Sequence, residues 1–225
     1  MNTPHAHGHG ALLLLFDVVA GAVGEHDDWH TREHLPERLS IPGFVRGTRW
    51  TRDTGSPRYC VIYDVADPGV LESPAYRERL DHPTPWTARM MTSYVGMRRT
   101  LCEVVAAAGE GIGAASLVVP HAAAAGRMDD LRRWLVHDAL PAVAACRGVA
   151  SWRLYANARE AAMTREQAIR GRDGSVAAAL VVTGYDDAAI SALASGALAP
   201  ERWAAHGAAG VEPAVYRLAC TIQAP

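Results

Sequence analysis

Two histidines and two glutamates lie close together in the stretch Asp28–Leu39, which reads DWHTREHLPERL. On a helix, His30 and His34 are one turn apart and share a face, and Glu33 lies beside them. An imidazole titrates near neutral pH, so either histidine has the chemistry of a general acid or base, with a carboxylate to orient it. The stretch therefore predicts a catalytic group formed by His30, His34 and Glu33.

The alternative is an exposed helix face on which these side chains form only weak ion pairs. The chain repeats the framework of this helix around Trp134, where Leu135 and Ala139 occupy the positions of the two histidines. Because the repeated helix does without histidine, the scaffold itself does not require it. This asymmetry favours the functional interpretation.

The histidine pair also has the spacing at which two side chains of one helix can share a metal ion. A third protein ligand would be needed, and no H-E-x-x-H or other completing pattern is present. A haem would need an axial histidine from elsewhere in the chain. The available ones are His82, His121, His137 and His206, and nothing singles one of them out. The sequence predicts no metal site and no cofactor.

Further candidates follow from strand alternation and helix spacing. Tyr63 lies on the third predicted strand and Arg98 on the fourth. A hydrogen-bond donor and a cation suit a ligand that carries a carboxylate or an enolate. Arg38, one turn beyond the second histidine, and Trp86, as an aromatic wall, complete the predicted substrate contacts. For each of them, packing in the core or on the surface is the alternative.

The composition fits a folded protein with a packed core. Of 225 residues, 49% are hydrophobic and 20% charged, which is enough apolar material for a packed core. With 22 basic and 24 acidic residues, the net charge is −2, and no concentrated basic face for nucleic acid is expected. No stretch approaches the roughly 20 apolar residues of a membrane span.

The cysteines and the N-terminal run favour a cytoplasmic protein. Cys60, Cys102, Cys146 and Cys220 are widely separated and form no C-x-x-C pair. Each lies in an apolar or strand-like setting, which favours reduced structural thiols over disulfides. The apolar run 11–16 lacks the basic region of a signal peptide, and Asp17 interrupts it, so a buried strand fits better.

Hydrophobic periodicity and turn residues predict two units with the same order of elements, β-α-β-β-α-β. A tail containing histidines spans residues 1–10, the first unit 11–105, a linker of small residues 106–113, and the second unit 114–225. Strands are predicted over 12–19, 44–51, 58–65, 97–105, 115–119, 149–155, 176–183 and 215–222. The main helices are predicted from about 28 to 39 and over 73–80, 128–145 and 186–194.

The two predicted units read as an internal duplication. At an offset of 105 the matched pairs are Trp29 with Trp134, Glu33 with Asp138, Leu35-Pro36 with Leu140-Pro141 and Gly43 with Gly148; at an offset of 118 they are Arg99 with Arg217 and Cys102 with Cys220. The larger offset fits an insertion in the second hairpin, over 156–173. A single sheet with helices on one face would leave its other face uncovered, and two copies in one chain solve this by packing sheet on sheet.

These features resemble a known superfamily. The helix motif Trp29-His30-x-x-x-His34-Leu35-Pro36, the turn Ile41-Pro42-Gly43 and the element order look like the dimeric α+β barrel superfamily. The nearest resemblance is to EthD-like proteins and their muconolactone-isomerase-type relatives, and it covers nearly the whole chain as two fused copies. It implies an α+β fold of two fused ferredoxin-like repeats, whose antiparallel sheets pack as an intramolecular α+β barrel. It also implies that polar residues of the histidine helix lie near a pocket mouth.

The resemblance leaves the chemistry open, because that superfamily includes monooxygenases, lactone isomerases, polyketide cyclases and haem enzymes. We expect a cofactor-independent isomerase, lyase or monooxygenase that acts on a small aromatic or lactone-like metabolite, with a helix histidine as general acid or base. The alternative is a non-catalytic small-molecule-binding or stress-type α+β barrel protein. The expected partner is a small-molecule ligand, with no nucleic acid and no membrane. A monomer, as an intramolecular pseudo-dimer, and a homodimer are both compatible with this fold.

Overall fold

The computed structural model describes residues 8–159 and 164–225, and the chain divides into two compact units. Unit 1 comprises Met1–Glu103, Asn157–Ser175 and Ala219–Pro225. Unit 2 comprises Val104–Ala156 and Val176–Leu218. Of the tail predicted over 1–10, residues 1–7 lie outside the described ranges, and Gly10 already belongs to a strand.

The sheet of unit 1 is antiparallel, with the strand order β4-β1-β3-β2. Its strands are β1 (Gly10–Val18), β2 (Phe44–Thr51), β3 (Tyr59–Val65) and β4 (Tyr94–Ala108). In the register of the sheet, Leu12 of β1 lies opposite Tyr63 of β3 on one side and Leu101 of β4 on the other. Strand β4 continues to Ala108, so the first residues of the predicted linker belong to a strand.

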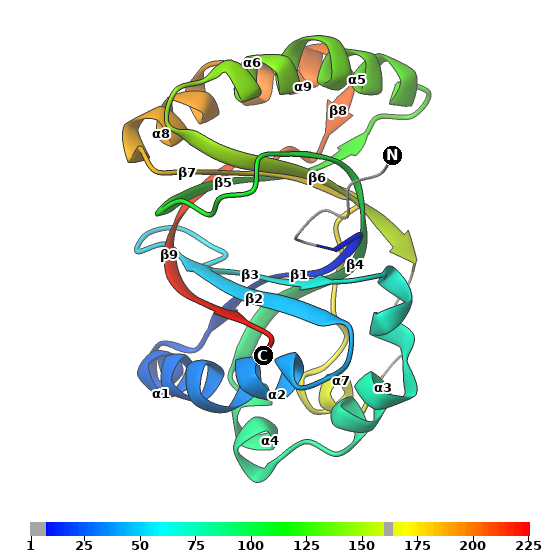
Figure 1. Ribbon diagram of the computed structural model, residues 1–225, viewed down its shortest axis with the longest axis vertical. Helices are drawn as coiled ribbons and strands as arrows, with labels where there is room; N and C mark the ends of the chain where they lie inside the picture. The colour runs from blue at the N-terminus through cyan, green and yellow to red at the C-terminus, as the bar shows by residue number, and fades with distance from the viewer. Residues whose placement is uncertain (1–7, 160–163) are drawn as a thin grey trace. The chain divides into compact units, whose positions relative to one another are not determined.

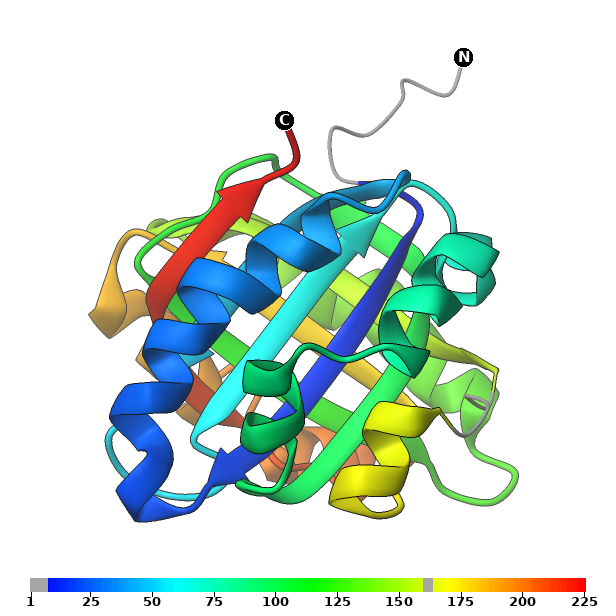
Figure 2. The same ribbon diagram turned by 90° about the horizontal axis from the view of Figure 1, so that it is seen from below.

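The helices of unit 1 lie on one face of this sheet (Figures 1 and 2). They are η1 (Ala20–Ala22), α1 (Val23–Trp29), η2 (His30–His34), α2 (Leu35–Leu39), η3 (Pro68–Glu72), α3 (Pro74–Asp81), α4 (Pro85–Met91) and α7 (Arg165–Arg170). The last three begin after Ser73, Thr84 and Thr164, whose hydroxyl oxygens accept hydrogen bonds from backbone N–H groups of the first turn. Helix α7 lies within the second hairpin of the chain, between β6 (Val149–Arg159) and β7 (Ala178–Gly184), but belongs to unit 1.

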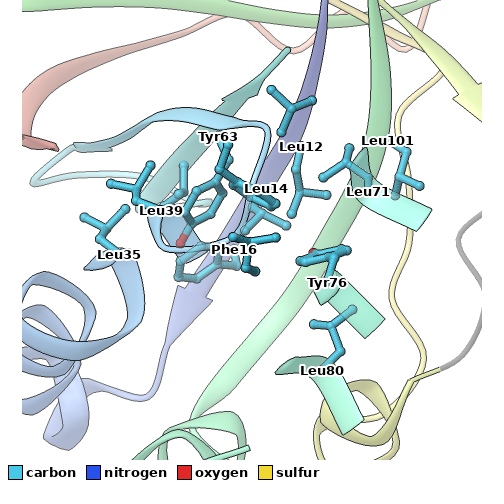
Figure 3. Packing of buried hydrophobic residues seen from close by; sticks show 14 of the residues in the cluster. Leu12, Leu14, Phe16, Leu35, Leu39, Tyr63, Leu71, Tyr76, Leu80 and Leu101 are labelled. Atoms are coloured by element: carbon cyan, nitrogen blue, oxygen red, sulfur yellow. The ribbon is translucent and has the colours of Figure 1, made fainter. Parts of the chain in front are cut away.

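The core of unit 1 forms between the sheet and these helices (Figure 3). Alternate residues of β1, namely Leu12, Leu14 and Phe16, pack in one cluster with Leu35 and Leu39 of α2. Because successive side chains of a strand point to opposite faces, this cluster marks the helix-covered face of the sheet.

Unit 2 has the same order of elements. Its strands are β5 (Ala115–Ala123), β6 (Val149–Arg159), β7 (Ala178–Gly184), β8 (Ala208–Ala209) and β9 (Ala214–Gln223), of which β6 and β9 also extend into unit 1. Its helices are α5 (Met128–Trp134), η4 (Leu135–Ala139), α6 (Leu140–Ala145), α8 (Asp187–Ser195) and α9 (Pro200–Ala205). The sheet is antiparallel in the order β6-β7-β5-β9, and β8 pairs with the end of β5. Within the described residues, no helix combines the length and the apolar character needed to cross a membrane.

Candidate active site

The histidine-bearing helix of unit 1 contains a wide turn. Helices α1 and α2 are joined by η2, a π-helical turn in which the backbone N–H of Leu35 donates to the carbonyl of His30, five residues back. A proline inside a regular helix clashes with the carbonyl four residues before it, and the wider turn just before Pro36 relieves that clash. The turn η4 stands in the same place before Pro141 in unit 2, so this distortion accompanies the Leu-Pro pair rather than the histidines.

Three buried histidines follow one another along this helix. The ring centroids of His26 and His30 are 5.5 Å apart, and those of His30 and His34 are 5.6 Å apart. All three side chains are buried, which excludes the exposed helix face considered above. His26 was not among the predicted site residues, although it lies four residues before His30 and continues the same spacing.

His30 is in hydrogen-bond contact with Tyr63. The hydroxyl oxygen of Tyr63 and Nε2 of His30 are 3.3 Å apart. Burial lowers the pKa of His30 well below its ordinary value, and the neighbouring charges of His26, Arg49 and Arg38 act in the same direction. Burial also raises the pKa of Tyr63 well above its ordinary value. A neutral imidazole therefore faces a protonated phenol at neutral pH.

Each of the three histidines keeps one buried ring nitrogen without a hydrogen-bond partner among the described residues. These atoms are Nε2 of His26, Nδ1 of His30 and Nδ1 of His34. The carboxylate of Glu37 approaches Nδ1 of His34 to 4.0 Å, which is beyond hydrogen-bond distance. Buried polar atoms in proteins are nearly always hydrogen-bonded, so each of these nitrogens has a hydrogen-bonding capacity that the described residues leave unused.

Glu33 fixes the helix instead of orienting a histidine. Its Oε1 accepts hydrogen bonds from Nε1 of Trp29 at 3.2 Å and from the hydroxyls of Thr84 at 2.5 Å and Thr87 at 3.3 Å. Three donors thus converge on one carboxylate oxygen, and they tie the histidine helix to α4. The predicted aromatic wall, Trp86, donates to Oε1 of Glu25 at 3.1 Å and packs against the small cluster that contains Trp29.

Arg38 is buried and already paired. It donates a hydrogen bond to the carboxylate of Glu166 in α7 and lies 3.4 Å from Oε2 of Glu37. Its guanidinium also lies over the ring of Tyr76, 5.9 Å from the centroid. An arginine with two carboxylate neighbours holds the helices together and is less available to a substrate than the sequence predicted. Glu166 was missed, although Thr164 and Gln167 form a capping box that identifies the start of α7.

Tyr63 and Arg98 were predicted to bind the same ligand, but the structure does not bring them together on one face of the sheet. Tyr63 lies opposite Leu12, on the helix-covered face. Arg98 lies opposite Leu15, one residue out of phase with that face. The arginine of β4 on the helix-covered face is the next residue, Arg99, whose Nη2 donates to the hydroxyl of Tyr76 at 3.3 Å. Strand alternation gives the phase within one strand but does not fix it relative to a neighbouring strand.

In the described part of the chain, no group of three or more histidine, cysteine or acidic side chains is arranged to hold a metal ion. The features brought together in unit 1 are thus three neutral imidazoles, a phenol and a set of paired charges.

Solved structures share this fold. An anthrone oxidase-like protein superposes with a TM-score of 0.67 at 15% identity, covering 96% of this chain and 93% of its own. A proposed monooxygenase from Fusobacterium nucleatum gives 0.62 at 10% identity, with 96% and 95% covered. A proposed chlorite dismutase gives 0.56 at 13% identity, with 94% of both chains covered. No family model and no curated protein matches the chain.

At these identities the likeness establishes the fold. Together with the element order of both units, it confirms the predicted class, an α+β protein built of two ferredoxin-like units with antiparallel sheets.

Proposed function

We propose that this protein is an enzyme that acts on a small aromatic or lactone-like metabolite, with His30 as the general base. The observation that supports this most strongly is the state of His30. It is 1% exposed, it contacts the hydroxyl of Tyr63, and its Nδ1 has no partner among the described residues. A positioned neutral imidazole is the usual group for proton abstraction near neutral pH.

His30 can act either as a base or as a hydrogen-bond donor towards a ligand, depending on which ring nitrogen carries the proton. With its proton on Nε2, His30 donates to the oxygen of Tyr63, and Nδ1 holds the lone pair that a base needs. With its proton on Nδ1, His30 accepts from Tyr63 and presents a donor to the ligand. Tyr63 thus acts as the group that selects the tautomer, and burial of both side chains excludes water from the pair.

The proposed step is removal of a proton from an acidic C–H or O–H bond of the substrate. The proton moves to Nδ1 of His30, and the electron pair stays on the substrate as an enolate or phenolate. An isomerase or lyase would return or relocate the proton. A cofactor-independent monooxygenase would let dioxygen react with the anion; for an anthrone, one oxygen atom replaces the two methylene hydrogens and the other leaves as water. The likeness to an anthrone oxidase-like protein supports testing this case first.

We further propose that the chain is an EthD-like tandem duplication. Both halves have a π-helical turn of five residues before the Leu-Pro pair, at His30–His34 and Leu135–Ala139. The positive φ angles of Gly43 and Gly148, 94° and 95°, recur at the same offset. Only the first copy carries the histidines, so we assign the reaction to unit 1.

The test is a turnover screen of the purified protein with anthrone and a set of unsaturated lactones, in air and without oxygen. We expect turnover of at least one member by the wild type and a loss of about 100-fold or more in His30→Gln, the range typical of a lost general base. His121→Gln is the matched control, since His121 is equally buried but lies in unit 2; its turnover should be unchanged.

The alternative is a non-catalytic small-molecule-binding protein, which the leucine-rich packing beside Tyr63 favours. If ligands of the screen bind but none is converted, or if His30→Gln retains full turnover, the catalytic proposal is wrong and the binding function replaces it.

A further inference from the structure

Arg99 is the one buried arginine whose charge has no carboxylate beside it in the described part of unit 1. Its side chain is 7% exposed. The other fully buried arginines are each paired: Arg38 with Glu166, Arg46 with Asp64 at 2.7 Å, and Arg49 with Asp27 at 3.7 Å. Arg99 has only the hydroxyl of Tyr76 at 3.3 Å, and its Nη1 has no hydrogen-bond partner.

An unpaired buried guanidinium is unfavourable, because its desolvation is not offset by a counter-charge. A bound anion would offset this cost, and the planar fork of arginine matches a carboxylate. The backbone around Arg99 is held firmly, because its N–H donates to the carbonyl of Gly174 and the N–H of Gly174 donates to the carbonyl of Met97, both at 2.8 Å. The side chain of Arg99 therefore extends from a backbone segment that these two hydrogen bonds hold in place.

A row of aromatic rings connects Arg99 with His30. The hydroxyl of Tyr76 touches the guanidinium, the ring centroids of Tyr76 and Phe44 are 5.4 Å apart, and those of Phe44 and Tyr63 are 5.9 Å apart. Tyr63 then contacts His30. Figure 3 shows Tyr63 and Tyr76 in the layer of side chains between the sheet and the helices. Aromatic rings in such a row favour a flat, ring-containing ligand.

We infer that Arg99 is the carboxylate anchor of the site, and that the substrate is an aromatic carboxylic acid whose ring lies along the tyrosines towards His30. This inference rests on the proposed function only for the role of His30. The role of Arg99 concerns ligand binding and does not depend on catalysis. Arg99 replaces Arg98 as the cation that a carboxylate-bearing ligand requires.

The test measures binding of two non-reacting probes of nearly equal shape, 2-naphthoate and 2-naphthamide, by titration calorimetry. We expect the wild type to bind 2-naphthoate at least tenfold more tightly than 2-naphthamide. Arg99→Met should lose this preference, and Arg99→Lys should keep part of it, since lysine retains the charge but not the fork. The lysine variant keeps the test decisive if the methionine variant does not fold.

Arg46→Met is the matched control, because Arg46 is as buried as Arg99 but paired with Asp64. It should keep the preference for 2-naphthoate and have a lower Tm, whereas Arg99→Met should have an unchanged or higher Tm. Equal binding of the two probes by the wild type, or an undiminished preference in Arg99→Met, would overturn the inference. So would acetate competing as effectively as 2-naphthoate, because the site would then take any small anion.

The outcomes separate the anchor from the catalytic proposal. A carboxylate preference that depends on Arg99, found together with full turnover in His30→Gln, would leave the anchor in place and refute the general base. Turnover that depends on His30, found with no preference for the carboxylate, would support the general base and refute the anchor.

Discussion

Burial gives the three histidines of unit 1 their chemical character. In an unfolded chain a histidine has a pKa of about 6.5. Burial lowers the pKa of His26, and it lowers the pKa values of His30 and His34 well below their ordinary value. The same desolvation that keeps His30 neutral, and so able to accept a proton, also makes protonation of the folded protein unfavourable.

The residue-scale prediction concerns stability against pH. Below about pH 6.5 the unfolded chain binds protons at these histidines and the folded protein does not, so the free energy of unfolding falls as the pH drops through this window towards the lowered pKa values. Above about pH 6.5 the histidines are neutral in both the folded and the unfolded state, so the free energy of unfolding keeps its full value. Each histidine adds a slope of up to about 1.4 kcal/mol per pH unit. Urea unfolding at pH 7.5, 6.5 and 5.5 measures the slope.

His34→Gln serves as the comparison for this prediction. Glutamine cannot titrate, so the variant should show a slope shallower by the share of one histidine. A wild-type stability that stays constant from pH 7.5 to 5.5 would show that the histidines are hydrated in the folded protein and would contradict the assigned burial.

At the scale of elements, helix α7 completes unit 1 from a distant part of the sequence. Glu166 binds Arg38 across 128 positions of the chain, and the backbone of Gly174 pairs with β4. Arg170 and Asp173 form an ion pair of 2.6 Å within the same segment, and Nη1 of Arg170 lies 3.2 Å from Sδ of Met91 in α4. The insertion predicted in the second hairpin therefore serves the first unit.

The element-scale prediction removes the charge that holds α7. Glu166→Gln leaves Arg38 buried with a weakened counter-charge, and we expect a loss of about 3 kcal/mol in the free energy of unfolding, typical of a broken buried pair. Glu201→Gln, at an exposed position of α9, is the control and should change stability by less than about 0.5 kcal/mol. Chemical denaturation followed by circular dichroism gives both values.

A second variant tests whether the charge or the packing matters. Arg38→Met combined with Glu166→Leu removes both charges and keeps apolar bulk, so it should recover most of the lost stability. If the double variant is less stable than Glu166→Gln alone, the contribution of the pair is not a charge effect.

How much of this site could be predicted depends on how far apart in the sequence the interacting residues lie. Helix spacing correctly placed His30 and His34 side by side, because three to four residues make one turn. Alternation separated the two faces within β3 and within β4 but did not give the phase of one strand relative to the other, so Arg98 was chosen where Arg99 faces the helices. The contact of Arg38 with Glu166 has no local signature, because it depends on where a distant helix packs.

At the scale of the whole molecule, the order of elements was predictable because local sequence patterns determine it. Each half reads β-α-β-β-α-β in short apolar and turn patterns that local physics determines, and solved structures of the same fold agree. The exchange of segments between halves was not predictable. Unit 1 takes Asn157–Ser175 and Ala219–Pro225 from the second half of the chain. No pattern in the sequence of those segments predicts that they pack in the first unit.

This exchange predicts that the first half cannot fold alone. A fragment of residues 1–113 lacks Glu166, so the charge of Arg38 stays buried without its main partner. It also lacks the backbone partners that Gly174 supplies to Met97 and Arg99 and that Ala224 supplies to Val45. We expect the fragment to give a broad, poorly cooperative thermal transition by circular dichroism. Co-expression with residues 114–225 should restore a single sharp transition, because the missing segments return with that half. A fragment 1–113 that unfolds as cooperatively as the full chain would show that the borrowed segments are dispensable, and the histidine site would then be a property of the first half by itself.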